Sequence, residues 1–248
     1  MGINIEFVKK CYNNKKRIDS YLDYFNSGID FGISYPERKL IQKYFKQDSN
    51  ILDIGCGVGR VEFALSNLGY KKITGIDISE GMINEAEKIN NTLGKNINFK
   101  IENVMELSFG DNEYESAIAF HAITPIPEVK NRYKALKEIY RVLRPGGNLI
   151  ISTFLREMRT DGFWEDEIAK WKSNLQDKRL YEFGDIISNN EGVEVFIHIP
   201  NRTEFANLLK SAGFTVTTEY VWSDLMNTDE EVTEAQKCKY WVAKKIGM

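Results

Sequence analysis

The chain has 248 residues, 42% of them hydrophobic, with a formal net charge of −3 and a pI near 5.7. This length allows one large domain with a buried core, and the weak acidic balance disfavours a broad nucleic-acid surface. Three widely spaced cysteines make neither a disulfide framework nor a CxxC metal site, and no apolar run approaches the roughly 18 residues of a membrane span. We therefore expect a single-domain, soluble and cytoplasmic protein.

The first 49 residues predict a helical cap. Apolar residues recur at helical spacing within residues 7–12 and 18–25, and Pro36 can open a third helix. A basic cluster lies within the first two helices, and its members are Lys9, Lys10, Lys15, Lys16 and Arg17. Such a cluster is usually a solvated helix face, and contact with RNA is the less favoured interpretation.

Residues 50–154 predict a core of parallel βαβ units, because β-rich runs alternate with helical patterns. The expected strands span residues 51–54, 73–78, 97–101, 116–120 and 148–154, and the clearest helices span 79–90 and 133–143. Ser79 is a good N-cap for the first of these helices. The Arg144-Pro145-Gly146-Gly147 sequence predicts a turn after the second.

This alternation ends at residue 154. Residues 155–193 mix charged side chains with several aromatic ones, including Trp164. An insertion this long in a compact domain is usually functional or a packed subdomain, and we interpret it as a lid over the binding site. Residues 194–248 predict the rest of the sheet, with a strand at 193–199, a helix near 205–212, and strands at 215–221 and 239–243.

A glycine loop follows the first predicted strand in "ILDIGCGVGR", residues 51–60. Gly55 and Gly57 would let the turn approach a ligand closely, and Gly59 would let the next helix pack on the sheet. A dinucleotide fingerprint has its third glycine five places after the first, whereas here it comes at four, and Asp53 would repel a pyrophosphate. A cationic ligand such as S-adenosylmethionine, with its ammonium and sulfonium, would instead be attracted.

A second acid, Asp77, ends the next strand in "ITGIDISEGM", residues 73–82, eighteen residues beyond Gly59. A carboxylate at this place can accept hydrogen bonds from both hydroxyls of a ribose. The structural alternative is an acid at a helix start, favoured there by the helix dipole. Together the two acids and the glycine spacing predict an adenosine-containing, positively charged ligand.

The motifs "DIGCGVGR", "GIDISEGM" and "LRPGGNLIIST" occur in this order within residues 50–154 and resemble the class I S-adenosylmethionine-dependent methyltransferases. The resemblance implies a Rossmann-like α/β fold. Its seven-stranded, mostly parallel sheet would have the order 3-2-1-4-5-7-6, with the last strand antiparallel. It also implies S-adenosyl-L-methionine as the cofactor.

The resemblance assigns residues along the cofactor by position. The methionine end would contact Asp53 and the loop residues Gly55, Cys56, Gly57 and Gly59, the ribose Asp77, and the adenine Ile78 and Met82. The family often has an Asp for the adenine amino group after the third strand, and by position the resemblance gives Asn103 and Val104 of this chain to the cofactor. Phe120 ends the fourth strand, at the sheet edge that faces ligands in parallel α/β proteins, and we predict that it contacts the cofactor.

Methyl transfer from a sulfonium is an in-line displacement on an activated donor, so positioning can supply most of the catalysis. His121 follows Phe120 and is the candidate base for a hydroxyl acceptor, with a rate expected to rise through a pKa of about 6 to 7. The candidate acceptor-site residues are Tyr12, Tyr21, Tyr24, Trp164 and His198.

We expect no metal, because the two histidines have no cysteine or acid cluster at ligand spacing. The sequence favours an O or N atom of a small-molecule acceptor, since a cap and an insertion can enclose a concave site. An RNA or protein methyltransferase, and a non-catalytic S-adenosylmethionine-binding protein, are the alternatives.

Overall fold

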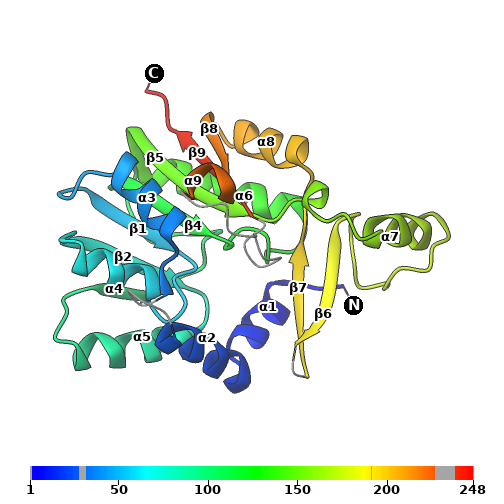
Figure 1. The fold of residues 1–248 in the computed structure, drawn as a ribbon, viewed down its shortest axis with the longest axis horizontal. Helices are drawn as coiled ribbons and strands as arrows, with labels where there is room; N and C mark the ends of the chain where they lie inside the picture. The colour runs from blue at the N-terminus through cyan, green and yellow to red at the C-terminus, as the bar shows by residue number, and fades with distance from the viewer. Residues whose placement is uncertain (1, 28–31, 191, 227–237, 248) are drawn as a thin grey trace.

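The computed structural model describes residues 2–27, 32–190, 192–226 and 238–247. A seven-stranded sheet of order β3-β2-β1-β4-β5-β9-β8 forms its centre (Figure 1). The strands are β1 (Asn50–Ile54), β2 (Lys72–Asp77), β3 (Asn98–Ile101), β4 (Tyr114–Phe120), β5 (Leu143–Thr153), β8 (Thr215–Val221) and β9 (Lys239–Lys244). The first five pair in parallel, and β9 runs antiparallel to both β5 and β8. The predicted topology is therefore confirmed.

Helices cover both faces of this sheet. One face packs α3 (Tyr35–Tyr44), α4 (Arg60–Asn67) and α5 (Glu80–Thr92), and the other packs α6 (Val129–Val142) and α8 (Arg202–Ser211). The alternation along β1 divides its side chains between the two cores, with Ile51 in the first and Leu52 in the second. Almost continuous burial of these strands is typical of a parallel sheet covered on both sides.

Two local details differ from the sequence prediction. Helix α6 begins at Val129, four residues before the expected start, after Glu128 with a φ of 64°. The predicted turn at residues 144–147 is an irregularity within β5: Tyr114 pairs with Leu143 and Ser116 with Asn148, so the extra residues bulge out of the ladder.

The N-terminal cap consists of α1 (Ile5–Tyr12) and α2 (Lys15–Ser27), followed by α3. Helix α2 lies against α5 and α1 against β7 (Figure 1). The junction between α1 and α2 is joined to the start of α5, because Asn13 Oδ1 accepts from the Gly81 N–H at 2.8 Å. The Ser79 hydroxyl donates to the Tyr12 carbonyl at 3.0 Å.

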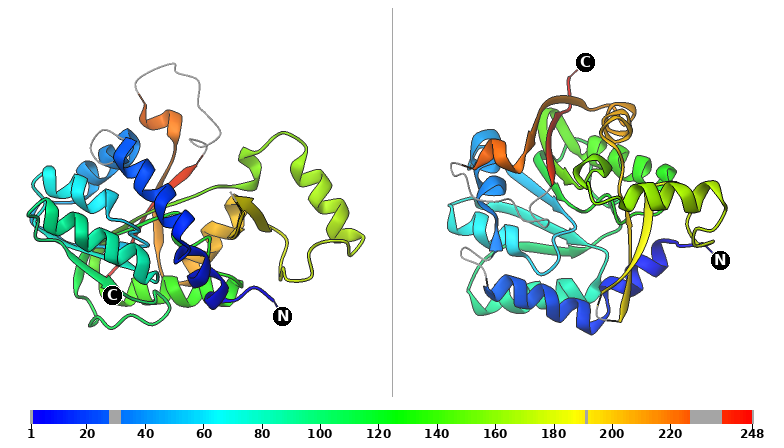
Figure 2. Two further views of the ribbon diagram at one scale, coloured as in Figure 1. Left: turned by 90° about the horizontal axis from the view of Figure 1, so that it is seen from below. Right: turned by 45° about the vertical axis from the view of Figure 1, so that its right-hand side comes forward.

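The insertion contains the short helix η2 (Arg156–Met158), α7 (Phe163–Lys172), β6 (Asp185–Asn190) and β7 (Val193–His198). Strands β6 and β7 form a separate antiparallel pair, so the strand expected at 193–199 does not join the main sheet. The predicted boundary between the insertion and the C-terminal part of the sheet, at residue 193, thus falls within the hairpin of β6 and β7. Helix α7 and this hairpin project from one end of the sheet domain in all three views (Figures 1 and 2).

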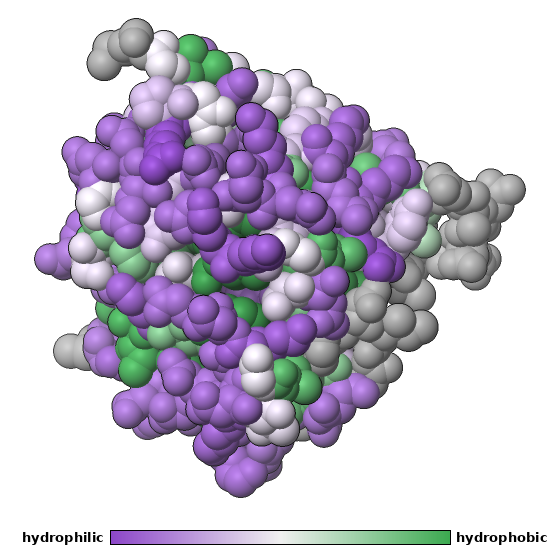
Figure 3. Space-filling model, turned by 90° about the vertical axis from the view of Figure 1, so that its left-hand side faces the viewer, coloured by the Kyte–Doolittle hydropathy of each residue, from purple (hydrophilic) through white to green (hydrophobic). Residues whose placement is uncertain are grey.

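The last short helix, α9 (Trp222–Leu225), follows β8 and packs near α3. Within the described residues, no helix is long and apolar enough to cross a membrane. The side on the left of Figure 1 is mostly hydrophilic, with apolar side chains showing only in narrow gaps between polar ones (Figure 3).

Candidate active site

A cavity of about 520 Å³ opens where β1, β2 and β4 end, between the sheet and the N-terminal cap. Asp53, Asp77 and Phe120 reach its wall from these three strands. Ligands of open parallel sheets bind at this edge, where the strand order reverses. The cavity is continuous from the glycine loop to a group of aromatic side chains beyond Phe120.

The glycine loop forms one wall and is held by backbone hydrogen bonds. The Gly55 and Cys56 N–H groups both donate to the Ile76 carbonyl, at 2.8 and 3.0 Å. Gly55 has a φ of 72°, and a Cβ there would lie 2.7 Å from the Ala122 Cβ, so a side chain cannot be accommodated. The loop therefore presents a bare backbone to a ligand, as the sequence predicts.

Gly59 has a different function from the other two loop glycines. It does not line the cavity; a Cβ there would come within 2.7 Å of Phe63 and 2.8 Å of Phe99. Its φ of 91° also disfavours a side chain. Gly59 thus allows α4 to pack on the sheet, and its predicted place beside the cofactor is corrected.

Asp53 and Asp77 lie on the wall beside the loop. Asp77 accepts hydrogen bonds from the Gly57 N–H at 3.0 Å and the Ser79 N–H at 2.9 Å, so it also fixes the loop and the start of α5. Burial raises the pKa of Asp53 to about 7 and raises that of Asp77 above its ordinary value. A ligand cation would favour the ionised form of both groups.

An apolar end of the cavity suits an adenine. Ile78, Met82 and Val104 line it from the positions that the family resemblance assigned, and the cap and the loop after β4 add Ile5, Val8, Pro125 and Ile126. Asn103 also lines it, and its Oδ1 accepts from the Met105 N–H at 3.0 Å. One lone pair of Oδ1 remains available for an adenine amino group.

The cap contributes aromatic residues and a cation that sequence reasoning missed. Tyr12, Tyr21 and Tyr24, which the sequence predicts as acceptor-site residues, all line the cavity. Arg17 lies 5.5 Å from the Tyr12 ring centroid and 5.0 Å from that of Tyr21, and its buried Nε has no hydrogen-bond partner among the described residues. The signal was present in the sequence, because Arg17 and Tyr21 are four residues apart and so share one face of a helix.

The opposite end of the cavity is aromatic. Phe120, His121, Phe154, Trp222 and Tyr240 line it, with the His121 and Phe154 rings stacked at 4.5 Å. A buried ion pair stands beside them, in which both guanidinium nitrogens of Arg60 contact Glu37 at 2.7 Å. The cation of Arg60 is therefore neutralised within the protein.

His121, at the aromatic end, has a strained backbone. Its φ is 54°, which is uncommon for a residue other than glycine and typical of functional turns. The buried Nδ1 has no hydrogen-bond partner among the described residues. Burial lowers the pKa of His121 to about 4, so the imidazole is neutral near pH 7, and the predicted pKa of 6 to 7 is corrected.

The insertion does not line the cavity. None of its described residues from 155 to 190 contributes to the wall, which corrects the predicted lid and the predicted acceptor contact of Trp164. The physical reason is that its aromatic residues pack on one another: Trp164 lies 5.0 Å from Phe163 and 5.8 Å from Phe183, ring centroid to ring centroid. Arg156 covers the Phe183 ring at 5.0 Å.

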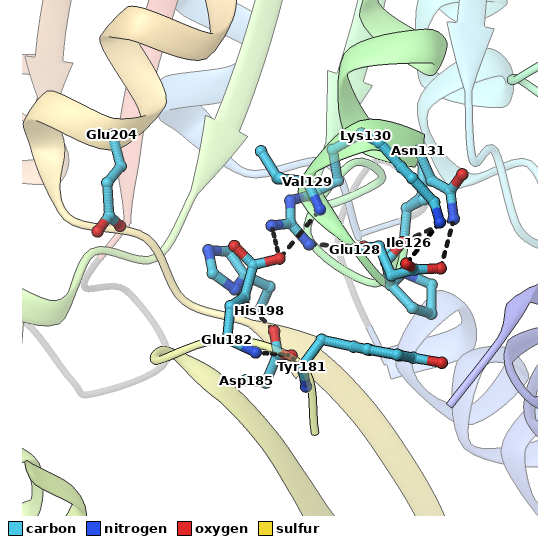
Figure 4. A network of polar contacts seen from close by, with 12 residues as sticks. Ile126, Glu128, Val129, Lys130, Asn131, Tyr181, Glu182, Asp185, His198 and Glu204 are labelled. Atoms are coloured by element: carbon cyan, nitrogen blue, oxygen red, sulfur yellow. Dashed lines mark hydrogen bonds and ion pairs between the residues drawn. The ribbon is translucent and has the colours of Figure 1, made fainter. Parts of the chain in front are cut away.

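His198 also lies away from the cavity, in a buried network at the base of the insertion (Figure 4). Its Nδ1 contacts Asp185 Oδ1 at 2.8 Å, and its backbone N–H donates to the Thr124 carbonyl at 2.9 Å. Glu182 accepts from Arg132 at 2.8 Å and from the Val129 N–H at 2.9 Å. His198 thus joins the insertion to the loop after β4, and its predicted acceptor contact is corrected.

Glu182, Asp185 and His198 could each offer a ligand atom to a metal ion, since these atoms lie within 4.8 Å of one another. The protein already occupies these atoms, however: Asp185 Oδ2 accepts from the Tyr181 and Glu182 N–H groups. The buried guanidinium of Arg132 adds a positive charge beside them. We therefore assign the cluster to structure.

The basic cluster of the cap does not form one surface. Arg17 turns toward the cavity, whereas Lys15 is exposed and paired with Asp19 at 2.6 Å. Arg17 is the one member of this basic cluster among the described residues that line the cavity, and the lysines therefore do not continue to it.

Comparisons with known proteins agree with this geometry. A family model described as a methyltransferase domain matches residues 51–147 of this chain. The chain is 28% identical over 226 residues to the protein named ubiquinone/menaquinone biosynthesis C-methyltransferase UbiE from Rickettsia prowazekii, a match that covers 85% of this chain and 88% of the relative.

Solved structures show the same fold. A protein from Methanosarcina mazei described as an S-adenosylmethionine-dependent methyltransferase is 26% identical, with a TM-score of 0.71 over 84% of this chain and 98% of the other. The 1,6-didemethyltoxoflavin-N1-methyltransferase of Burkholderia thailandensis, solved with bound 1,6-didemethyltoxoflavin and S-adenosylhomocysteine, has a TM-score of 0.59 at 17% identity, over 93% of this chain and 87% of the other.

Proposed function

We propose, for a chain that belongs to the class I S-adenosylmethionine-dependent methyltransferases, that the methyl acceptor is a small neutral molecule held at the aromatic end of the cavity. The observation that carries the proposal is one continuous cavity, with the cofactor loop at one end and aromatic rings at the other. Such enclosure suits a small ligand better than a polymer.

The chain's own residues fit the cofactor. The bare loop at Gly55 and Gly57 would admit the methionine portion, Asp53 would pair with its ammonium, and Arg17 would supply a cation for its carboxylate. Asp77 would accept hydrogen bonds from the ribose hydroxyls. The bound cofactor supplies an activated methyl group, and the protein's contribution is to align an acceptor atom with it.

The charge of the wall indicates a neutral acceptor. Among the described wall residues the cations are Arg17, beside the cofactor loop, and Arg60, which Glu37 neutralises. A carboxylate or phosphate on the acceptor would therefore lack a partner and be costly to bury. Flat apolar molecules would instead stack on the rings of Phe154 and Trp222.

We assign proton removal from a hydroxyl acceptor to His121, because this residue lines the cavity, its imidazole is neutral near pH 7, and its buried Nδ1 has no hydrogen-bond partner among the described residues. Oxygen and nitrogen are candidate acceptor atoms on this chemistry. Carbon joins them, since the similar relatives are named C-methyltransferases. Deprotonating a hydroxyl on an aromatic ring would activate ring carbon as well as oxygen.

An acceptor screen tests the proposal. Protein and tritium-methyl-labelled cofactor are incubated with metabolite, RNA and peptide pools, with S-adenosylhomocysteine in excess as the inhibited control. We expect label in the metabolite fraction. Label confined to RNA or peptide would contradict a small-molecule acceptor, and cofactor binding without any transfer would favour the non-catalytic alternative.

We also propose that the protein works in the cytoplasm. The supporting observation is that Cys11, Cys56 and Cys238 are all buried free thiols, as is usual in reducing compartments. Cell fractionation would test it, and recovery with the membrane or secreted fraction would contradict it.

A further inference from the structure

Glu62 is a fully buried carboxyl group behind the cofactor end of the cavity. It lies in the first turn of α4, is 0% exposed and does not line the cavity. Neither of its oxygens has a hydrogen-bond donor among the described residues. An ionised carboxylate in such a place would be strongly destabilised, so the group needs a proton or a partner.

The sheet register places Glu62 beside Asp53. Asp53 pairs with Gly75 on the neighbouring strand, and a Cβ on Gly75 would lie only 2.3 Å from Glu62 Oε1. The Glu62 carboxyl therefore fills the space that the missing Gly75 side chain leaves, on the sheet face that Asp53 shares with α4. The sequence makes room for this acid with a glycine at that one position.

Few positive charges are available to these two acids. The charged and titratable groups that face them are Arg60 of α4, Glu37 of α3, Asp77 of β2 and the Cys56 thiol of the loop. Arg60 is already bound to Glu37. Burial raises the pKa of Glu62 well above its ordinary value, and the neighbouring Asp53 charge adds to that shift.

We propose that Glu62 is a positioning residue for the cofactor: it shares one proton with Asp53, orients that carboxylate, and the pair releases the proton when the cationic cofactor binds. On this proposal one proton is held between the Glu62 and Asp53 carboxyl groups in the free protein, so the pair carries one negative charge. The ammonium and sulfonium of the cofactor favour a second negative charge, and the O–H proton passes to solvent. The inference depends on the cofactor assignment but not on the proposed acceptor.

Calorimetry without any acceptor tests the proton release. Binding heats for S-adenosylmethionine at pH 7 are measured in buffers of different ionisation enthalpy, whose slope gives the protons released. For the wild type we expect roughly half to one proton, and an affinity that rises roughly 10- to 100-fold between pH 6 and pH 8. S-adenosylhomocysteine, which lacks the sulfonium, should release fewer.

Glu62→Gln keeps the shape and a hydrogen-bond donor but cannot ionise. We expect it to bind the cofactor at pH 6 within about threefold of the wild type, to release no proton and to show a flat pH profile. Glu62→Leu, which also removes the donor, should bind more weakly at every pH. Glu87→Gln on the exposed face of α5 is the matched control and should keep the wild-type slope.

Two results would overturn the inference. One is a wild-type protein that binds the cofactor with no proton exchange and a flat profile, which needs no variant to fold. The other is a Glu62→Gln variant that releases as many protons as the wild type, which would assign the proton to another group. Either result would leave the proposed acceptor untouched, because no acceptor is present.

Discussion

The N-terminal cap and the insertion are both aromatic-rich additions to the sheet, yet only the cap lines the cavity. Tyr12 and Tyr21 of the cap face the cofactor loop, with the Arg17 guanidinium against both rings. In the insertion, Trp164 and Phe183 pack on each other instead. Aromatic content therefore indicates that a segment is packed, and the partners available within the segment decide whether its rings are left for a ligand.

The insertion still acts on the cavity, but through the backbone. The His198 N–H donates to the Thr124 carbonyl, and Glu182 accepts from the Val129 N–H, so the insertion holds both ends of residues 124–129. Pro125 and Ile126 of this stretch line the cavity. The cap contacts a ligand directly, whereas the insertion fixes the loop that does so.

The largest expected effect separates the two histidines. His121→Ala should slow transfer to a hydroxyl acceptor roughly 100- to 10,000-fold and leave cofactor affinity nearly unchanged, since His121 is assigned to proton removal. His198→Ala, in the insertion, should leave the chemical step within a few-fold but lower stability. Single-turnover rates for both variants are the measurement. Equal losses in both would mean that His121 acts only by packing.

The same variants have a pH signature. Because the neutral imidazole is the base and burial lowers the pKa of His121 to about 4, the wild-type single-turnover rate, measured with cofactor saturating at every pH, should rise with pH through about 4 and be flat from pH 6 to 8. Because the pKa is lowered on folding, the unfolded chain binds this proton more tightly than the folded protein does. The free energy of unfolding should therefore decrease as the pH falls from about 6.5 toward 4. A rate still rising between pH 6 and 8 would contradict the assignment.

Trp164→Ala should show that the insertion is a structural unit. Removing a buried indole from its aromatic cluster should lower the free energy of unfolding by about 3 to 5 kcal/mol. Cofactor affinity of the folded variant should remain that of the wild type, because Trp164 does not line the cavity. Denaturant unfolding and calorimetry measure the two quantities, and a loss of cofactor affinity at unchanged stability would contradict a purely structural role for Trp164.

Arg17→Met, in contrast, should weaken cofactor binding. It keeps an unbranched apolar side chain beside Tyr12 and Tyr21 but removes the cation proposed for the cofactor carboxylate, so affinity should fall roughly 10- to 150-fold, or about 1.5 to 3 kcal/mol. Arg159→Met in the insertion is the matched control, with a guanidinium over the Phe163 ring. An unchanged dissociation constant for Arg17→Met would make this residue part of the packing alone.

The smallest effect is expected on the outer face of the cap. Changing Lys10 and Lys15 to Ala together should alter small-molecule methylation by less than about twofold, because both side chains are exposed. Transfer to an RNA pool provides the contrast. If the double variant lost RNA methylation while keeping cofactor affinity, the basic face would be a binding surface.

The sequence predicted what local rules determine. Asp53, Asp77 and the glycines at 55 and 57 lie where strand ends and tight turns must place them, and the sheet order was predicted with them. Contacts between distant segments were not predictable in the same way. Trp164 depends on the fold of its own insertion, and Glu62 can be recognised only when the register places it over Gly75.

The Asp77 carboxylate already accepts hydrogen bonds from the backbone amides of Gly57 and Ser79. A ribose bound to the same carboxylate adds contacts to an element that organises both the glycine turn and the start of α5. Cofactor binding should therefore stabilise the glycine turn and the start of α5, and slow hydrogen exchange at these two amides more than at the edge strand β3. The backbone that recognises the nucleoside would then be most rigid when the nucleoside is bound.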